Sequence, residues 1–343
     1  MTDSTLEFEA LSENRDLKAQ ITKLQGQLHR EKQRNIALTT AAREGARDAI
    51  LQLGKPPKVP EPKYRAAGDG KPEVAVLHLS DWQIGKKTTS FDSEVAEARL
   101  TELGHLLEEM TEIERGDHPV TECHLLLGGD MVEGVNIFPG QQWEIDSTLF
   151  EQHARASRCI VNLTRHAARV HAVVHIWEED GNHGRIGRKG DMPKGDNADK
   201  FVYFNARGEL RDLIDEGRVV WHETTNGWHS IVTIGNYRAL LVHGDEIKSF
   251  GGQTPAFGIA KKVSAWAAGV TEPFIDCYMG HWHTPMSLAL PVGNRRVFVN
   301  PSIESGNIYA QEFVGANGFP GQRLVYINPV RGRVTSERIL WLD

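Results

Sequence analysis

Five short polar clusters, each directly after an apolar run, contain the side chains of this sequence best suited to chemistry. They are Ser80-Asp81-Trp82-Gln83, Gly128-Gly129-Asp130-Met131-Val132-Glu133, Gly181-Asn182-His183, His243-Gly244-Asp245 and Gly280-His281-Trp282-His283. Together they offer carboxylate, amide and imidazole donors, which suit Mn²⁺, Fe or Zn²⁺. Taken singly, each cluster is more readily explained as a turn or a helix cap, so the prediction of a metal site depends on the whole set.

The apolar runs before these clusters predict strands, and amphipathic stretches between the early runs predict helices. The expected strands cover 74–80, 124–127, 172–177, 239–242, 275–279, 297–299 and 324–327, with a hairpin at 235–236 and helices over 94–113 and 150–170. Ligand sites of α/β proteins collect at the carboxyl ends of strands, where the clusters stand. We therefore expect an α/β fold with two packed sheets flanked by helices.

The first 72 residues differ in composition from the rest. Residues 1–53 are predicted to be helical, and Leu17, Ile21, Leu24 and Leu28 follow the spacing of a coiled-coil seam. The seam is short, so a solvated helix is as good an interpretation as self-association. Residues 54–72 contain five prolines and predict a linker, which leaves 73–343 as the main domain.

Composition limits the classes of protein that fit. The chain has 343 residues, 40% hydrophobic and 25% charged, with a formal net charge of −7. This charge argues against bulk coating of nucleic acid, although Lys and Arg outnumber Asp and Glu between Arg15 and Arg65. The three cysteines lie among apolar neighbours, and neither a signal peptide nor a membrane span is expected. We predict a cytoplasmic protein, in the host cytoplasm if it is viral.

In their order along the chain, the five clusters resemble the motifs of the calcineurin-like metallophosphoesterase family. The resemblance runs from Leu79 to about Ile303. It implies a two-sheet β-sandwich flanked by helices, with two divalent metal ions, for which we favour Mn²⁺ over Fe, Zn²⁺ or Mg²⁺. It also implies a ligand set, with Asp130 bridging the metals, Asp81, Gln83 and His283 on the first, and Asn182, His243 and His281 on the second. By the same resemblance, His183 is the catalytic histidine and Glu133 orients it.

Two positions depart from the family pattern. Gln83 stands where the family usually has His, and a neutral amide oxygen is a weaker ligand for borderline metals. The first site is thus expected to bind loosely or to prefer Mn²⁺. Gly184 replaces the usual acidic residue, which is expected to loosen the loop behind His183. A degenerate, non-catalytic binding protein is therefore one alternative.

Basic residues follow the His183 motif and suggest the substrate. Arg185, Arg188 and Lys189 are expected to bind a phosphodiester backbone, although a solvated basic loop is equally typical of such residues. Within the family, the sequence is similar in style to the Mre11/SbcD-type nucleases, which cut DNA ends. We predict a DNA nuclease with nucleic acid as its partner and a possible homo-oligomer formed through the N-terminal helix. A phosphomonoesterase or protein phosphatase is the alternative.

Overall fold

The computed structural model describes residues 3–52, 58–62, 70–187, 192–193, 195–224, 227–248, 254–291, 293–306 and 319–342. The chain divides into two compact units, Met1–Gly54 and Lys55–Asp343. The smaller unit contains one helix, α1 (Asp3–Gln52). Leu17, Ile21, Leu24 and Leu28 are all exposed on it. The expected N-terminal helix is therefore present, whereas its pairing with a second copy stays a prediction.

The larger unit contains a six-stranded sheet in the order β11-β10-β1-β2-β3-β4. Strands β1 to β4 pair in parallel, whereas β10 and β11 pair antiparallel. The strands are β1 (Glu73–Leu79), β2 (Val120–Leu127), β3 (Val173–Glu178), β4 (Val219–His222), β10 (Gly321–Asn328) and β11 (Arg333–Trp341). Long helices α2 (Ser93–Glu114) and α3 (Leu149–Val170) connect the parallel strands, as such connections require. The short helices are α4 (Ala198–Glu209), α5 (Arg211–Asp215) and η1 (Gln141–Trp143).

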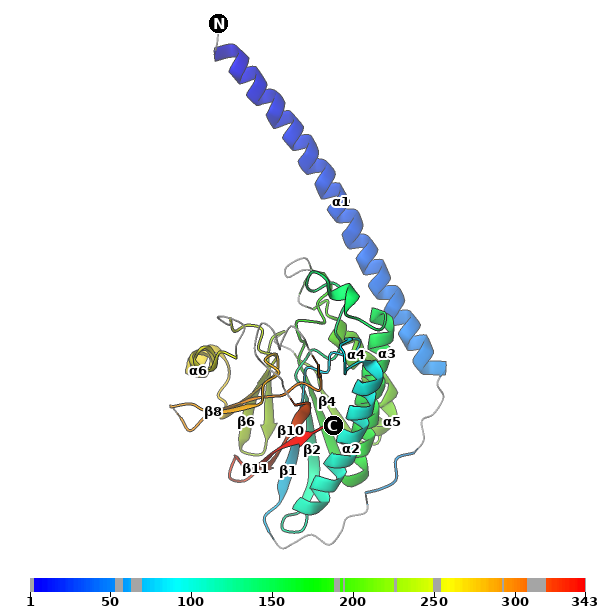
Figure 1. Ribbon diagram of the computed structural model, residues 1–343, viewed down its shortest axis with the longest axis vertical. Helices are drawn as coiled ribbons and strands as arrows, with labels where there is room; N and C mark the ends of the chain where they lie inside the picture. Colours follow the sequence, from blue (N-terminus) through cyan, green and yellow to red (C-terminus); the bar gives the residue numbers. More distant parts are fainter. Residues whose placement is uncertain are drawn as a thin grey trace. The chain divides into compact units, whose positions relative to one another are not determined.

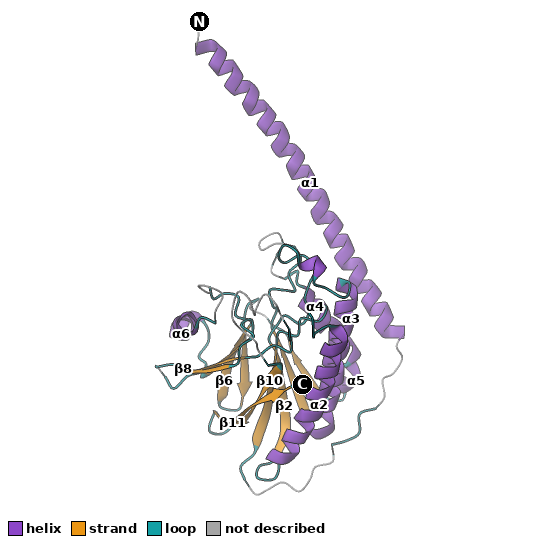
Figure 2. Ribbon diagram, in the orientation of Figure 1, coloured by secondary structure: helices purple, strands orange, loops and turns teal. Residues whose placement is uncertain are grey.

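A second, five-stranded sheet has the order β5-β6-β7-β9-β8. Its strands are β5 (Ser230–Ile234), β6 (Tyr237–Val242), β7 (Asp276–Met279), β8 (Met286–Ala289) and β9 (Arg296–Val299). The turn at 235–236 joins β5 to β6, as predicted. The helical segments α6 (Ala256–Ala265) and η2 (Trp266–Val270) accompany this sheet. Figure 1 shows α2 and α3 on the side of β1 and β2, and Figure 2 shows the same layers by type of structure.

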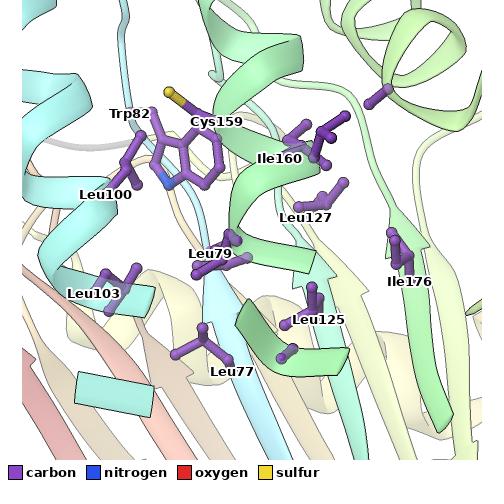
Figure 3. Packing of buried hydrophobic residues seen from close by; sticks show 14 of the residues in the cluster. Leu77, Leu79, Trp82, Leu100, Leu103, Leu125, Leu127, Cys159, Ile160 and Ile176 are labelled. Carbon is purple, nitrogen blue, oxygen red and sulfur yellow. The ribbon is translucent and has the colours of Figure 1, made fainter. Parts of the chain in front are cut away.

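Three apolar clusters hold these layers together. The largest lies between the six-stranded sheet and helices α2, α3 and α4, and it includes Leu77, Leu125, Ile160 and Trp82 (Figure 3). A second fills the space between the two sheets, and a third lies between the five-stranded sheet and α6. The fold class predicted from the sequence, two packed sheets flanked by helices, is therefore confirmed.

The sequence did not predict helices α4 and α6, and the other elements that it missed are short or lie at edges. Strands β4 and β8 have four residues each, and α5 has five. Edge strand β11 alternates between exposed and half-buried side chains along most of its length. Such segments have too few residues for a clear periodicity, whereas the buried strands and long helices show it strongly. None of the helices that the structure describes is long and apolar enough to cross a membrane.

Candidate metal centre

The five motif loops meet at the carboxyl ends of strands from both sheets. Three follow β1, β2 and β3 of the first sheet, and two follow β6 and β7 of the second. Backbone contacts join them directly. The Gln83 amide donates to the carbonyl of Asp130 at 2.9 Å, and the His183 amide donates to Asp130 Oδ1 at 2.6 Å. The His281 amide lies 2.9 Å from Asp81 Oδ1, so residues 200 positions apart are in contact.

Most of the predicted ligands have an unusual backbone conformation. Among the described residues other than glycine, six have positive φ, and five of them are predicted ligands: Asp81 (56°), Gln83 (45°), Asp130 (56°), His281 (68°) and His283 (55°). Left-handed conformations of this kind cost roughly 1 kcal/mol or more each and gather at functional sites. Because neighbouring loops bond to one another, the surrounding structure holds these residues in place.

One group of donors surrounds the side chain of His243. Its Nδ1 lies 2.8 Å from the Gly128 carbonyl, which can only accept, so Nδ1 carries the hydrogen. Its Nε2 faces Asp130 Oδ2 at 3.0 Å and Asn182 Oδ1 at 3.2 Å. His281 completes the group, since one donor atom each from Asp130, His243 and His281 lies within 4.8 Å of the others.

His243 Nε2, Asp130 Oδ2 and Asn182 Oδ1 all direct electron pairs at one point, so a proton or a cation is needed between them. Burial alone lowers the pKa of His243, but the Asp130 carboxylate outweighs burial and holds this pKa well above its usual value. Asp130 is itself buried, and His243 and His183 keep its pKa below its usual range. A bound divalent cation would take the place of the proton on His243 Nε2. The arrangement therefore fits the second predicted metal, the one expected to bind Asn182, His243 and His281.

The second group of donors lies around Asp81, which is fully buried. His283 Nε2 is 3.4 Å from Asp81 Oδ1 and 3.3 Å from the amide Nε2 of Gln83. The other amide atom, Gln83 Oε1, is buried without a hydrogen-bond partner. Turning the amide over would direct this oxygen at Asp81 and His283, where a cation would satisfy it. The residues predicted for the first metal are thus brought together and fit a cation.

Glu304 supports this second group, and sequence reasoning missed it. Its Oε2 is 3.5 Å from His283 Nδ1, and its Oε1 is 3.0 Å from the buried ammonium of Lys86. A carboxylate close to the second ring nitrogen of a histidine favours a proton on that nitrogen and so favours the tautomer needed for ligation. Glu304 stands in no recognisable motif, so only the folded chain shows its proximity to His283.

His183 lies beside these donors with its ring anchored by Glu133. Its Nδ1 is 3.1 Å from Glu133 Oε2 and 3.1 Å from the Glu133 carbonyl. Gln141 in turn donates to Glu133 Oε1 at 2.9 Å. Burial lowers the pKa of His183, but the carboxylates of Asp130 and Glu133 outweigh it and raise the pKa to about 9. The ring therefore holds a proton at neutral pH and can donate it from Nε2.

Asp199, at the start of α4, is a structural member of the centre that sequence reasoning did not find. Its buried carboxylate accepts the amides of Asp130 at 2.9 Å, Met131 at 3.1 Å and Gly181 at 2.9 Å. It therefore ties the loop after β2 to the loop after β3. In the sequence it reads as an acidic residue in the first turn of a helix, a position with an ordinary capping explanation.

Gly184 does not loosen the loop as the sequence suggested. A Cβ on this residue would lie 2.0 Å from Asn197 Oδ1. Asn197 donates from Nδ2 to the Gly181 carbonyl at 2.8 Å, and the Ala198 amide donates to the Gly184 carbonyl at 2.6 Å. The glycine makes room for a side chain that braces the His183 loop. The expectation of a loosened loop was wrong for this physical reason.

The remaining predicted residues have mixed outcomes. Arg185 is partly exposed, and its Nη1 lies 3.6 Å from Asp245 Oδ2, beside the His243 loop. Arg188 and Lys189 lie outside the described residues. Of the two tryptophans inside the motifs, Trp82 is fully buried in the largest apolar cluster, whereas Trp282 packs half-buried against the third cluster.

Comparisons with known proteins were made for sequence and for structure. No protein-family model matches the sequence, and no curated protein matches it. Among solved structures, a predicted phosphoesterase from Streptococcus pneumoniae has 13% identity, a TM-score of 0.34, and coverage of 78% of this chain and 98% of that chain. An archaeal phosphodiesterase has 11% identity, a TM-score of 0.36, and coverage of 78% and 99%. Zinc-bound Vps29 from Entamoeba histolytica has 13% identity, a TM-score of 0.31, and coverage of 77% and 98%.

Two of these three proteins are described as a phosphoesterase or a phosphodiesterase. In its two-sheet fold and in the order of its motif loops, the chain resembles the calcineurin-like metallophosphoesterases. Because these identities and TM-scores are low, the chemistry proposed for this chain depends on its own side chains. The Mre11/SbcD-type branch stays a prediction.

Proposed function

We propose that this chain is a metal-dependent phosphoesterase that hydrolyses the phosphodiester bonds of DNA. The observation that carries the proposal is that adjoining loops bring two groups of metal-ligand donors together, with the imidazole of His183 beside them. One group is centred on Asp130 and His243, and the other on Asp81 and His283. The unpartnered Gln83 Oε1 in the Asp81 group and the converging Asp130 and His243 donor atoms in the other group both favour cations.

The two cations, when bound, would activate water as a nucleophile and neutralise phosphate oxygens. The protein's own groups supply the remaining steps. His183 would transfer a proton from Nε2 to the leaving oxygen. Glu133 holds the ring through Nδ1, which leaves Nε2 as the transferring atom. Asp199 keeps the Asp130 and Gly181 loops at a fixed separation.

Two features near His183 support a nucleic-acid substrate. The ring of Phe138, which is 36% exposed, lies 6.1 Å from the His183 ring, edge to face. Exposed aromatic rings stack on nucleobases with little regard to sequence. Arg185 adds a positive charge on the side of the His243 loop, where it can pair with phosphate. A base and a phosphate would thus find complementary groups near the proposed proton donor.

The test is hydrolysis of bis-p-nitrophenyl phosphate and of single- and double-stranded DNA, with Mn²⁺, Zn²⁺, Fe²⁺ or Mg²⁺ added to metal-free protein. We expect Mn²⁺-dependent cleavage of both substrates. His183→Ala should lower the rate at least about a hundredfold without loss of bound metal, because it removes only the proton donor. His29→Ala, an exposed histidine of α1, is the matched control and should retain the full rate.

Other results would point elsewhere. Turnover of p-nitrophenyl phosphate without turnover of the diester or DNA would favour a phosphomonoesterase. Metal binding without turnover of any of these substrates would favour a non-catalytic binding protein. Equal rates for the wild type and His183→Ala would contradict the role of His183 while leaving metal-dependent hydrolysis in place.

A further inference from the structure

We infer that Glu73, Glu114 and His118 form a separate binding site for one divalent transition-metal ion, at the end of the six-stranded sheet opposite the metal centre. One donor atom from each residue lies within 4.8 Å of the other two. Glu73 begins β1, Glu114 ends α2, and His118 lies in the turn that leads from α2 to β2. The predicted centre lies at the other ends of β1 and β2, so the two sites are distinct.

The first argument is the state of Glu73. This carboxylate is only 4% exposed, and its Oε2 is buried without a hydrogen-bond partner. Leaving a carboxylate oxygen buried and unsatisfied is costly, and a cation is the usual remedy. The neighbouring Glu114 is paired with Arg338, whose Nη2 lies 3.3 Å from Glu114 Oε2, and this leaves Glu114 Oε1 for a ligand.

The second argument is the tautomer of His118. Its Nδ1 is 2.9 Å from the carbonyl of Lys71, and a carbonyl can only accept, so Nδ1 carries the hydrogen. The electron pair of a neutral ring is then on Nε2. Metal-binding histidines typically donate their second ring N–H to a carbonyl or carboxylate in this way. His118 is thus already in the form that a metal needs.

Among the residues that the structure describes, the other two comparable clusters outside the metal centre lack such an unsatisfied carboxylate and a histidine in this tautomer. In the Glu122–His124–His175 cluster, the Trp177 indole donates to His124 Nδ1 at 3.0 Å, so the hydrogen is on Nε2 and points at Glu122. In the His105–Glu108–His166 cluster, Glu108 is 2.6 Å from His166 Nδ1 and 3.5 Å from the guanidinium of Arg169. Hydrogen bonds and a nearby cation already satisfy those carboxylates.

The surroundings favour a cation of a particular class. The site lies at the C-terminal end of α2, where the helix dipole attracts positive charge. Two carboxylate oxygens and one imidazole nitrogen suit Zn²⁺ or Mn²⁺ better than Ca²⁺, which prefers oxygen alone. Ligand atoms around Zn²⁺ lie closer together than 4.8 Å, and the partly exposed Glu114 and His118 have the freedom to contract.

A metal ion here would hold residues 70–73, at the start of the domain, against the turn between α2 and β2. The Gly70 amide donates to the Asp117 carbonyl at 3.1 Å, and the Glu73 amide donates to the Pro119 carbonyl at 2.9 Å. A Cβ on Gly70 would lie 2.3 Å from the Asp117 oxygen, so this contact needs glycine. Residues 70–73 therefore already lie against the α2–β2 turn, and the ion would join them through side chains from both segments.

The experiment counts metal per chain after dialysis against Zn²⁺, by elemental analysis, for the wild type, Glu114→Gln and His118→Ala. We expect each variant to lose about one equivalent and to keep its rate on bis-p-nitrophenyl phosphate. Glu109→Gln, an exposed carboxylate on the same helix, is the control and should bind as much as the wild type. Asp130→Asn should lose metal from the other centre and retain this equivalent.

Equal metal content in the wild type, Glu114→Gln and His118→Ala would overturn the inference. A second variant guards against misfolding as the cause of any loss, because Glu73→Gln keeps the shape of the buried side chain. If Glu73→Gln raises the melting temperature of metal-free protein and leaves its metal content unchanged, then Glu73 and Glu114 share a proton and no ion binds. Loss of the equivalent in folded Glu73→Gln supports the site.

Discussion

Gln83 is the residue on which the strength of the first metal site depends. It occupies a position where the family pattern has His, and its amide oxygen is buried without a partner. Its φ of 45° is one that His tolerates, so the backbone does not exclude the exchange. We expect Gln83→His to tighten metal binding at the Asp81 group about tenfold, because imidazole is the better donor for borderline metals.

Competition with a chromophoric chelator measures this change in affinity. Hydrolysis at limiting Mn²⁺ should increase in parallel, whereas hydrolysis at saturating Mn²⁺ should change little. An unchanged dissociation constant in Gln83→His would mean that residue 83 does not contact the ion. The ligand set would then have to be redrawn around Asp81 and His283.

At the scale of elements, the loop between β3 and α4 shows how a departure from a motif can be compensated. The side chain of Asn197 occupies the space beside Gly184 where a Cβ would lie. Asn197 also caps α4 by accepting the Asp199 amide. Restoring the usual acidic residue with Gly184→Asp should therefore impair the protein. We expect a loss of about 2 kcal/mol in the free energy of unfolding and weaker hydrolysis, because the new Cβ collides with Asn197.

A double-mutant cycle with Asn197→Ala checks this reading. Asn197→Ala alone should cost about 1 kcal/mol through loss of the cap. In the Asn197→Ala background, Gly184→Asp should lower the free energy of unfolding by less than it does in the wild type. Gly195→Ala, where an added Cβ meets nothing within 4 Å, is the control and should be close to neutral in urea denaturation. Additive costs in the cycle would show that the two side chains do not interact.

Sequence patterns predicted the elements that carry the centre and the residues of its five loops. Runs such as 74–80 and 124–127 are predominantly apolar because both faces of their strands are covered, and this makes them easy to recognise. The supporting residues could not be predicted in the same way. Asp199 and Glu304 contact residues in other loops, and nothing in their local sequence distinguishes them from ordinary surface carboxylates.

At the scale of the whole molecule, stability should depend on the protonation of Glu179. Burial raises the pKa of Glu179 from 4.5 to about 8, although hydroxyls of Ser230 and Thr224 bond to it. The folded protein thus holds a proton that the unfolded chain releases above its lower pKa. This contribution to stability is complete below pH 4.5 and is lost as the pH rises through about 8.

Glu179→Gln removes this titration while keeping the acceptor oxygen for both hydroxyls. Relative to the wild type, the variant should gain on the order of 3 kcal/mol in the free energy of unfolding between about pH 5 and pH 8, as follows from the linkage of pKa to stability. Urea denaturation at a series of pH values measures the difference. The exposed Glu216→Gln is the control, and a difference that does not vary with pH would contradict the assignment.

Helix α1 bears on the assembly of the chain. Leu17, Ile21, Leu24 and Leu28 are 51–62% exposed, and their spacing suits a partner helix. If two copies pair through them, Leu24→Lys with Leu28→Lys should convert a dimer into a monomer in sedimentation and leave hydrolysis unchanged. Ala19→Lys with Thr22→Lys adds the same charge away from the seam and should remain dimeric. A wild-type monomer would exclude this pairing.

The left-handed backbone at the predicted ligands limits which residue types can occupy these positions. At Asp81, Gln83, Asp130, His281 and His283, a replacement must suit the main chain before its affinity for metal matters. Asn, Asp and His adopt such angles readily, whereas branched Val, Ile and Thr do not. A survey of all substitutions should therefore rank folding tolerance by conformational preference, even in metal-free protein. The backbone conformation of the fold thus restricts the metal-ligand positions to a few types of side chain.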